Sequence, residues 1–110
     1  MNNDVKAYLV SYTVTLDDYK QEVIEETLTP ILGTKDGIKR AEFYAAGNAG
    51  LRAEFVLTTA QIDYNGEKEL ELDGERYAIY RTYPVGQDYV ELYCEHKVGV
   101  QEPESDNNAD

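Results

Sequence analysis

Tight-turn signals separating short apolar segments dominate the C-terminal half of this sequence. Asn-Gly at 65–66 and Asp-Gly at 73–74 are typical of two-residue β-hairpins, because such turns require a positive φ. A third turn signal, Gly-Gln-Asp, follows at 86–88. The remaining residues are rich in β-favouring side chains, and we expect three strands in an antiparallel meander, with Pro84 ending the second. These strands are expected at 67–72, 75–83 and 89–97.

The N-terminal half adds further strand patterns. In segment 7–14 the residues Tyr8, Val10, Tyr12 and Val14 recur at period two, which predicts a strand that buries this face. A turn is expected over 16–20, and 22–29 is interpreted as a second strand, although its pattern alone also allows a short helix. Pro30, Gly33 and Gly37 together predict a loop, and 52–62 is again rich in β-favouring residues.

Only one segment reads as a helix, at 39–48, within an excursion that spans about 38–51. It is rich in helix-favouring residues, and Phe43 and Ala46 share one face at a spacing of three. Gly47 and Gly50 mark its end. Two interpretations of Phe43 and Tyr44 stay open: both cover the end of the sheet, or both dock on a neighbouring subunit or partner.

The length limits the architecture. One domain fits into 110 residues, and about six strands in so short a chain favour closure, because closure removes exposed strand edges. We predict a mainly β fold: a small antiparallel β-barrel over 1–100 with the helix inserted. Residues 101–110 carry four acids and one apolar residue, and are expected to form a disordered tail.

The charge excludes several functions. The chain has 10 Lys and Arg against 22 Asp and Glu, a net charge of −12, of which −8 belongs to residues 1–100. An acidic surface repels nucleic acid and anionic membranes. No apolar stretch approaches the length of a membrane span, and the N-terminus shows no signal-peptide pattern, so we expect no membrane association. A single cysteine allows no intrachain disulfide and fits a reducing compartment.

The residue pattern shows no catalytic centre, cofactor motif or metal site. Cys94 alternates in phase with Val90 and Leu92, which favours a buried side chain over a reactive thiol. His96 is expected at an exposed strand end, and one Cys with one His is too few for a structural zinc site. The acids at odd positions over 67–75 are interpreted as a solvated strand face. We therefore expect a protein that is not an enzyme and holds no cofactor.

A set of segments in fixed order carries a resemblance over 39–99. These segments are RAEFYAAGNAGL at 40–51, RAEFVL at 52–57, DYNGE at 63–67, GERYAIYRTY at 74–83 and VELYCEHKVG at 90–99. In this order and spacing the set resembles the head closure proteins, or head-tail adaptors and stoppers, of long-tailed bacteriophages and of prophages in Gram-positive bacteria. The N-terminal part matches less well, because 17–20 lacks the glycine of the family's hairpin and 30–37 differs.

The resemblance implies a structural virion protein, made in the cytoplasm of the bacterial host. Such proteins look like small β-barrels with an inserted helix, and identical subunits form a ring beneath the portal and its adaptor. The ring extends the DNA channel, closes it after genome packaging and offers a docking face to the tail. Its implied partners are other copies of itself, the portal-adaptor complex, tail proteins, and genomic DNA as channel content without tight binding.

A closed ring needs two different complementary patches on each subunit. The excursion, with Phe43, Tyr44 and Leu51, is a candidate for one patch. Tyrosines of the last two strands are candidates for the other: Tyr80, Tyr89 and Tyr93.

Two alternatives come from other classes. The net charge and the acids of 67–75 suit an inhibitor that mimics DNA, or another small protein-binding β-barrel module. An acid-pair hydrolase would need two carboxylates in unequal environments, and the sequence places no such pair.

Overall fold

The computed structural model describes residues 4–96, and 65% of the structure is β-strand. Within this range the chain forms six strands, one α-helix and a short 3₁₀ helix. Their bounds are β1 (Asp4–Leu16), β2 (Glu22–Gly37), α1 (Arg40–Asn48), β3 (Ala53–Ala60), η1 (Gln61–Asp63), β4 (Glu69–Leu72), β5 (Glu75–Val85) and β6 (Tyr89–His96). The expected tail at 101–110 lies outside the described residues.

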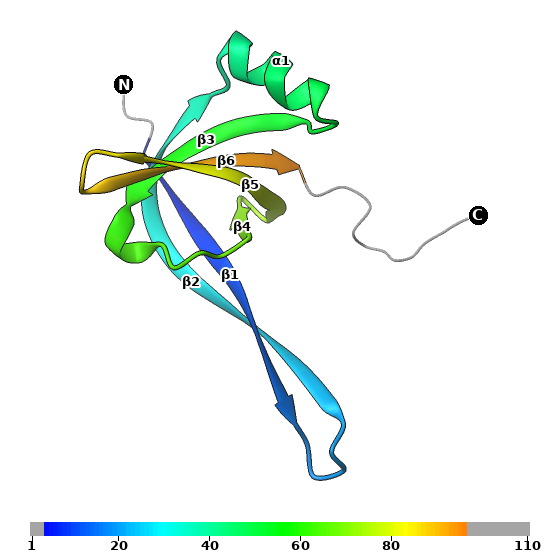
Figure 1. The fold of residues 1–110 in the computed structure, drawn as a ribbon. Helices are drawn as coiled ribbons and strands as arrows, with labels where there is room; N and C mark the ends of the chain where they lie inside the picture. Colours follow the sequence, from blue (N-terminus) through cyan, green and yellow to red (C-terminus); the bar gives the residue numbers. More distant parts are fainter. Residues whose placement is uncertain (1–3, 97–110) are drawn as a thin grey trace.

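The six strands close into an antiparallel barrel in the order β1-β2-β3-β6-β5-β4 (Figure 1). This confirms the predicted fold class. Closure pairs β1 with β4 over Tyr8–Val10, and so joins the N-terminal hairpin to the C-terminal meander. The interior is filled by small and branched side chains and one aromatic ring: Ala7, Leu9, Ile31, Phe55, Leu57, Leu70, Leu72, Ile79, Val90, Leu92 and Cys94.

The hairpin of β1 and β2 extends far beyond the barrel. The two strands pair continuously from Asp4 opposite Thr34 to Leu16 opposite Glu22. Only their barrel ends pair with a third strand. The pairing of β1 with β4 ends at Val10, and the pairing of β2 with β3 begins at Gly33. Residues 11–28, called the arm below, therefore form a two-stranded ribbon that projects from the barrel (Figure 1). The molecule is 51 Å long with a radius of gyration of 15.9 Å, against about 13 Å for a compact domain of 100 residues.

The arm closes at its tip without a glycine. The Asp17 carboxylate accepts hydrogen bonds from the backbone N–H of Tyr19 at 2.8 Å and of Gln21 at 2.9 Å. Lys20 takes the positive φ of 63° that the turn requires. An aspartate that caps its own turn therefore fixes the tip.

The predicted loop at 30–37 is wrong, because β2 continues through it. Pro30 lies opposite Tyr8 at a point where β2 has only β1 beside it, so the missing N–H removes no bond to a second neighbour. Gly33 lies where β2 first meets β3, and a Cβ there would lie 2.8 Å from the Thr58 carbonyl oxygen. The glycine therefore marks a close approach of two strands.

The strands also settle the interpretation of residues 22–29 and of Pro84. Residues 22–29 form a strand, so the helix that the pattern also allowed is not present. Pro84 does not end β5, which runs on to Val85 beside β6. The reason is the same as for Pro30, because β4 pairs only with Glu75–Ala78 and leaves the other edge of β5 free near Pro84.

The predicted buried face of the first strand is also wrong. Ala7 and Leu9 enter the core, while Tyr12 is 50% and Val14 57% exposed. Only Val10 of the period-two set is fully buried, at 2%. The pattern is that of a strand with one buried face, but the subunit itself provides nothing to cover it beyond the barrel.

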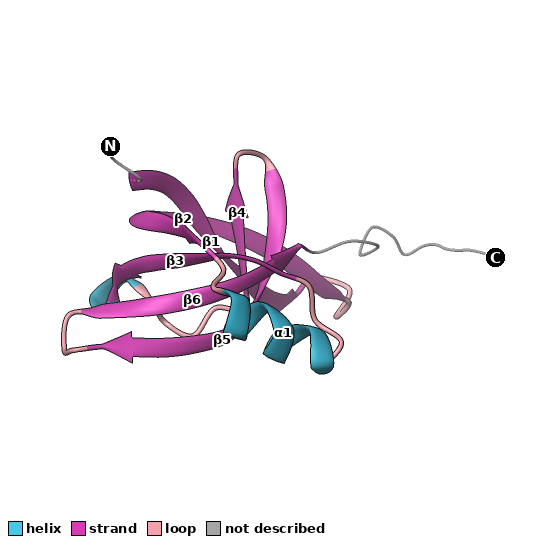
Figure 2. Ribbon diagram, turned by 90° about the horizontal axis from the view of Figure 1, so that it is seen from above, coloured by secondary structure: helices cyan, strands magenta, loops and turns pink. Residues whose placement is uncertain are grey.

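The helix α1 lies across the barrel beside β3 and β6 (Figure 2). Its only fully buried residue is Ala46, whose carbonyl oxygen accepts the Leu51 N–H at 2.8 Å and so ends the helix. No helix in the described range is long and apolar enough to cross a membrane.

Candidate assembly surfaces

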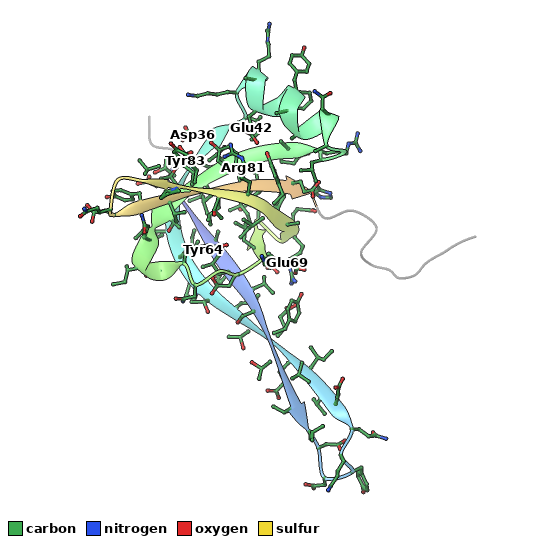
Figure 3. The ribbon with its side chains drawn as sticks, in the orientation of Figure 1. Asp36, Glu42, Tyr64, Glu69, Arg81 and Tyr83 are labelled. Atoms are coloured by element: carbon green, nitrogen blue, oxygen red, sulfur yellow. The ribbon has the colours of Figure 1, made fainter. Side chains whose placement is uncertain are left out.

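The Glu42 carboxylate joins α1 to the barrel. Glu42 accepts a hydrogen bond from Tyr80 Oη at 2.7 Å and pairs with Arg81 Nη2 at 2.6 Å. Figure 3 shows Glu42 pointing from the helix toward Arg81 on the sheet. The Arg81 guanidinium lies 3.9 Å from the centre of the Tyr93 ring, which adds a cation–π contact. The hydrogen bond from Arg81 lowers the pKa of Glu42, so the pair is charged at neutral pH.

This contact occupies two of the predicted interface tyrosines. Tyr80 and Tyr93 are half-buried, with their rings 6.2 Å apart at an angle of 62°. Burial, and then the hydrogen bond to Glu42, raise the pKa of Tyr80 above its ordinary value. The visible role of both side chains is to position α1.

The opposite side of α1 faces solvent. Phe43 is 54% and Tyr44 62% exposed, so neither covers the end of the barrel, and their rings meet edge to face. Arg40 precedes them by one helical turn and shares their face with Gly47. Beside this face a shallow hollow of about 650 Å³ is lined by Phe43, Gly47, Gly50, Leu51, Arg52, Ala53, Glu54 and His96. We call this face and hollow the α1 surface.

The remaining predicted interface residues are separated. Leu51 lines the hollow of the α1 surface. Tyr89 is 53% exposed but lies opposite Ala60, at the far end of β6, whereas Ala53 beside the hollow lies opposite Glu95. The structure therefore gathers Phe43, Tyr44 and Leu51 on one surface and leaves Tyr89 apart from it.

The arm carries a second surface, which the sequence interpretation missed. Residues opposite each other in an antiparallel pair share a face, so Val14 and Ile24 lie together and Leu16 lies beside Glu22. With Tyr12 they form an apolar stripe along one face, here called the arm stripe: Tyr12, Val14, Leu16 and Ile24. The other face is mostly polar, with Thr13 opposite Glu25 and Ser11 opposite Thr27. The sequence signal was the period-two pattern that had been assigned to the core.

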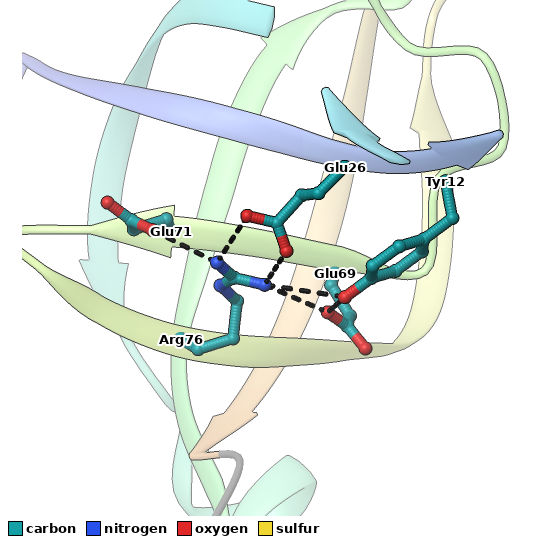
Figure 4. Close-up of polar contacts among 5 residues, drawn as sticks. All are labelled: Tyr12, Glu26, Glu69, Glu71 and Arg76. Atoms are coloured by element: carbon teal, nitrogen blue, oxygen red, sulfur yellow. Dashed lines mark hydrogen bonds and ion pairs between the residues drawn. The ribbon is translucent and has the colours of Figure 1, made fainter. Parts of the chain in front are cut away.

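An ion-pair cluster lies where the arm leaves the barrel (Figure 4). Arg76 on β5 binds both oxygens of Glu26 on the arm, at 3.0 and 3.2 Å. Its two terminal nitrogens also reach Glu69 at 3.4 Å and Glu71 at 3.2 Å. Tyr12 Oη donates to Glu69 at 2.8 Å and completes the cluster. The guanidinium therefore joins the arm to both β4 and β5.

The cluster corrects the interpretation of the acids at 67–75 as a solvated face for Glu69 and Glu71, while Asp73 and Glu75 are exposed as expected. The Glu69 side chain is only 12% exposed and that of Glu71 only 28%, and both bind Arg76. The hydrogen bond from Arg76 lowers the pKa of Glu26, and these contacts in turn raise the pKa of Arg76. Glu26, Glu69 and Glu71 are thus structural partners of one arginine, which the strand pattern alone does not reveal.

Cys94 and His96 offer no reactive pair. Cys94 is fully buried in the core, as predicted, and desolvation raises the pKa of its thiol to about 12. His96 ends β6 and places Nε2 3.1 Å from the Glu75 carboxylate, while its ring packs edge to face on Tyr77. Residues 4–96 contain no group of three or more His, Cys, Asp or Glu side chains that could hold a metal ion.

The chain matches no protein-family model, and a search of curated proteins finds no match. The features of this subunit that point to a function are the α1 surface, the arm stripe and the charges around them.

Proposed function

We propose that this protein is a structural subunit of a bacteriophage head-tail connector, a head closure protein that joins the portal-adaptor complex to the tail and closes the DNA channel. One observation carries the proposal. The barrel is complete and fills its own core, yet it holds out an arm whose apolar stripe the subunit does not cover. Such a surface is typical of a protein that functions within an assembly.

The two surfaces suit a ring of identical subunits. The α1 surface and the arm lie at opposite ends of the molecule (Figure 1). A ring joins one patch to a different patch on the next subunit, and so requires two separate surfaces. The acidic charge is compatible with DNA in the channel, because like charges keep a duplex from binding tightly to the wall.

An inhibitor that mimics DNA is the second candidate, because the arm exposes five carboxylates against one lysine: Asp17, Asp18, Glu22, Glu25 and Glu26 with Lys20. A protein that mimics the charge of DNA needs exposed carboxylates, and the apolar arm stripe would add nothing to that role. Affinity purification separates the candidates: a mimic is released from its target by added DNA, whereas a connector subunit co-purifies with portal-complex proteins.

Deletion of the gene in its phage or prophage tests the proposal directly. We expect DNA-filled heads that lose their genome and lack tails, as seen by electron microscopy and by sensitivity of the DNA to nuclease. The wild-type gene supplied from a plasmid restores tailed particles. Infectious particles without the protein contradict the proposal.

A double substitution, Phe43→Ala with Tyr44→Ala, tests the α1 surface within this function. Both side chains are more than half exposed, so we expect the subunit to fold with an unchanged circular dichroism spectrum and to fail in head-tail joining. Ile62→Ala, at an 87% exposed side chain outside both surfaces, is the matched control and leaves joining intact. A double variant that unfolds would make the two aromatics part of the core and overturn the assignment.

A further inference from the structure

We propose that the arm stripe of one subunit docks on the α1 surface of a second copy of this chain, head to tail. This inference rests on the proposed function, which requires contacts between identical subunits, and it names the two surfaces that make them.

The arm stripe is an apolar face without a cover. Among residues 4–96, seven of the fourteen large hydrophobic side chains that are exposed lie in the arm: Tyr12, Val14, Leu16, Tyr19, Val23, Ile24 and Leu28. Tyr12, Val14 and Leu16 alternate with threonines, which is the pattern of a strand that buries one face. The barrel core contains none of these residues.

The arm also needs support. An isolated two-stranded ribbon is at best marginally stable in water, because it buries too little apolar surface. The Arg76 cluster holds only the base of the arm, through Tyr12 and Glu26, and the capped turn at Asp17 closes its tip. A partner surface over the stripe supplies the burial that the segment between them lacks.

The charges on the α1 surface make it a suitable partner for the arm stripe. Arg40 and Arg52 are exposed and form no ion pair with any carboxylate of residues 4–96. The one acid of α1, Glu42, is already neutralised by Arg81. The α1 surface therefore carries two guanidinium groups without an ion pair in residues 4–96, against Glu54 in the lining of its hollow and Glu95, which accepts a hydrogen bond from the Arg52 backbone N–H at 3.2 Å.

The arm supplies the opposite charge around its apolar side chains. Glu22 lies on the stripe face beside Leu16, and Asp17 and Asp18 lie at the tip. Aromatic and basic groups on one surface thus match apolar and acidic groups on the other, which is the complementarity that fixes register in a protein interface.

The two surfaces are too far apart to meet within one subunit. They lie at opposite ends of a molecule 51 Å long (Figure 1). The arm therefore reaches the α1 surface of a neighbour, and repeating this contact leads to a closed ring or an open helix.

Disulfide trapping between two single variants of the full chain tests the contact. Val14→Cys places a thiol on the stripe, and Gly47→Cys places one on the α1 surface, where an added Cβ meets no atom within 4 Å. The native Cys94 does not compete, because it is buried and its pKa is raised to about 12. We expect a mixed disulfide when the two purified variants are combined at millimolar concentration under mild oxidation.

Thr13→Cys is the matched control, because it moves the thiol to the other face of the same strand. It is expected to give far less mixed disulfide with Gly47→Cys. Three results overturn the proposal: no mixed disulfide, equal yields from Val14→Cys and Thr13→Cys, or a Val14→Cys disulfide with itself as the main product, which indicates a symmetric contact of two arms.

A charge exchange tests the electrostatic part. Arg40→Glu on one partner, or Glu22→Arg on the other, is expected to lower the yield of trapped pair by about tenfold, and combining the two restores it. Lys6→Glu makes the same charge change outside both surfaces and leaves the yield unchanged. Failure of the combined exchange to restore the yield overturns the charge pairing.

The outcomes separate this inference from the proposed function. If the deletion phage lacks tails but the thiols do not form the expected pair, the connector role stands and the subunits meet elsewhere. If the deletion phage is infectious, the connector role fails whatever the trapping shows.

Discussion

Arg76 is the residue on which the geometry of the arm depends. It comes from β5, yet its guanidinium binds Glu26 of the arm and both Glu69 and Glu71 of β4. Charge-assisted, two-point contacts with a carboxylate fix direction as well as distance. The cluster therefore sets the angle at which the arm leaves the barrel.

Replacing Arg76 by methionine should destabilise the protein by about 1–3 kcal/mol, because three carboxylates lose their shared charged donor. Urea denaturation followed by tyrosine fluorescence measures this loss near neutral pH. Arg52→Met is the matched control, because the Arg52 side chain has no ion pair within residues 4–96. This substitution should change the free energy of unfolding by no more than about 0.5 kcal/mol.

The stability that Arg76 contributes should depend on pH. Arg76 lowers the pKa of Glu26 in the folded protein below its ordinary 4.5. Stability from this contact is therefore complete above that value and is lost as the pH falls through the lowered pKa. The difference in free energy of unfolding between wild type and Arg76→Met should become smaller in acid. A difference that stays constant with pH would contradict the role of the carboxylates.

At the scale of elements, turn chemistry decides where strands end. The turn from β4 to β5 has Asp73 at φ 54° and Gly74 at φ 80°, the two positive values of the predicted two-residue hairpin. The tip of the arm achieves its reversal differently, through the Asp17 side chain. Prolines do not end strands here, because Pro30 and Pro84 lie beside free edges.

Gly74→Ala should lower the free energy of unfolding by about 1–2 kcal/mol, because a Cβ is disfavoured at positive φ. Gly37→Ala serves as the control, since that glycine has no positive φ and an added Cβ meets no atom within 4 Å. The free energy of unfolding of both variants, measured in urea, checks the difference. Equal stabilities would mean that the turn readily adopts another conformation.

In the molecule as a whole, the arm is joined to the barrel through the Arg76 cluster at its base but contributes nothing to the barrel core. The core cluster contains residues from β1 to β6 but none from 11–28. The core therefore forms without the arm, and under the proposed function the arm serves assembly.

Replacing residues 13–25 by Asn-Gly tests this separation, because Tyr12 and Glu26 stay in place for the Arg76 cluster. We expect a folded barrel with cooperative unfolding and near-native stability, and complete loss of head-tail joining in a phage complementation assay. A truncated chain that does not fold would show that the arm contributes to the core.

Much of the fold could be predicted from the sequence. The three C-terminal strands, the hairpin at 73–74, the helix near 39–48 and the buried Cys94 follow from turn dipeptides, helix propensity and alternation, which are local signals. The strand through Pro30 and Gly33 could not, because both residues favour loops unless the neighbouring strands are known. The Arg76 cluster joins residues up to 64 positions apart, and no local pattern records such a contact.

Alternation and turn chemistry act between near neighbours, so the sequence was enough to predict a small closed β structure with one helical excursion. It was also enough to show the period-two pattern of Tyr12, Val14 and Leu16. That these side chains lie outside the core became clear only from the fold, because burial depends on the neighbouring strands, and beyond Val10 no third strand lies beside β1.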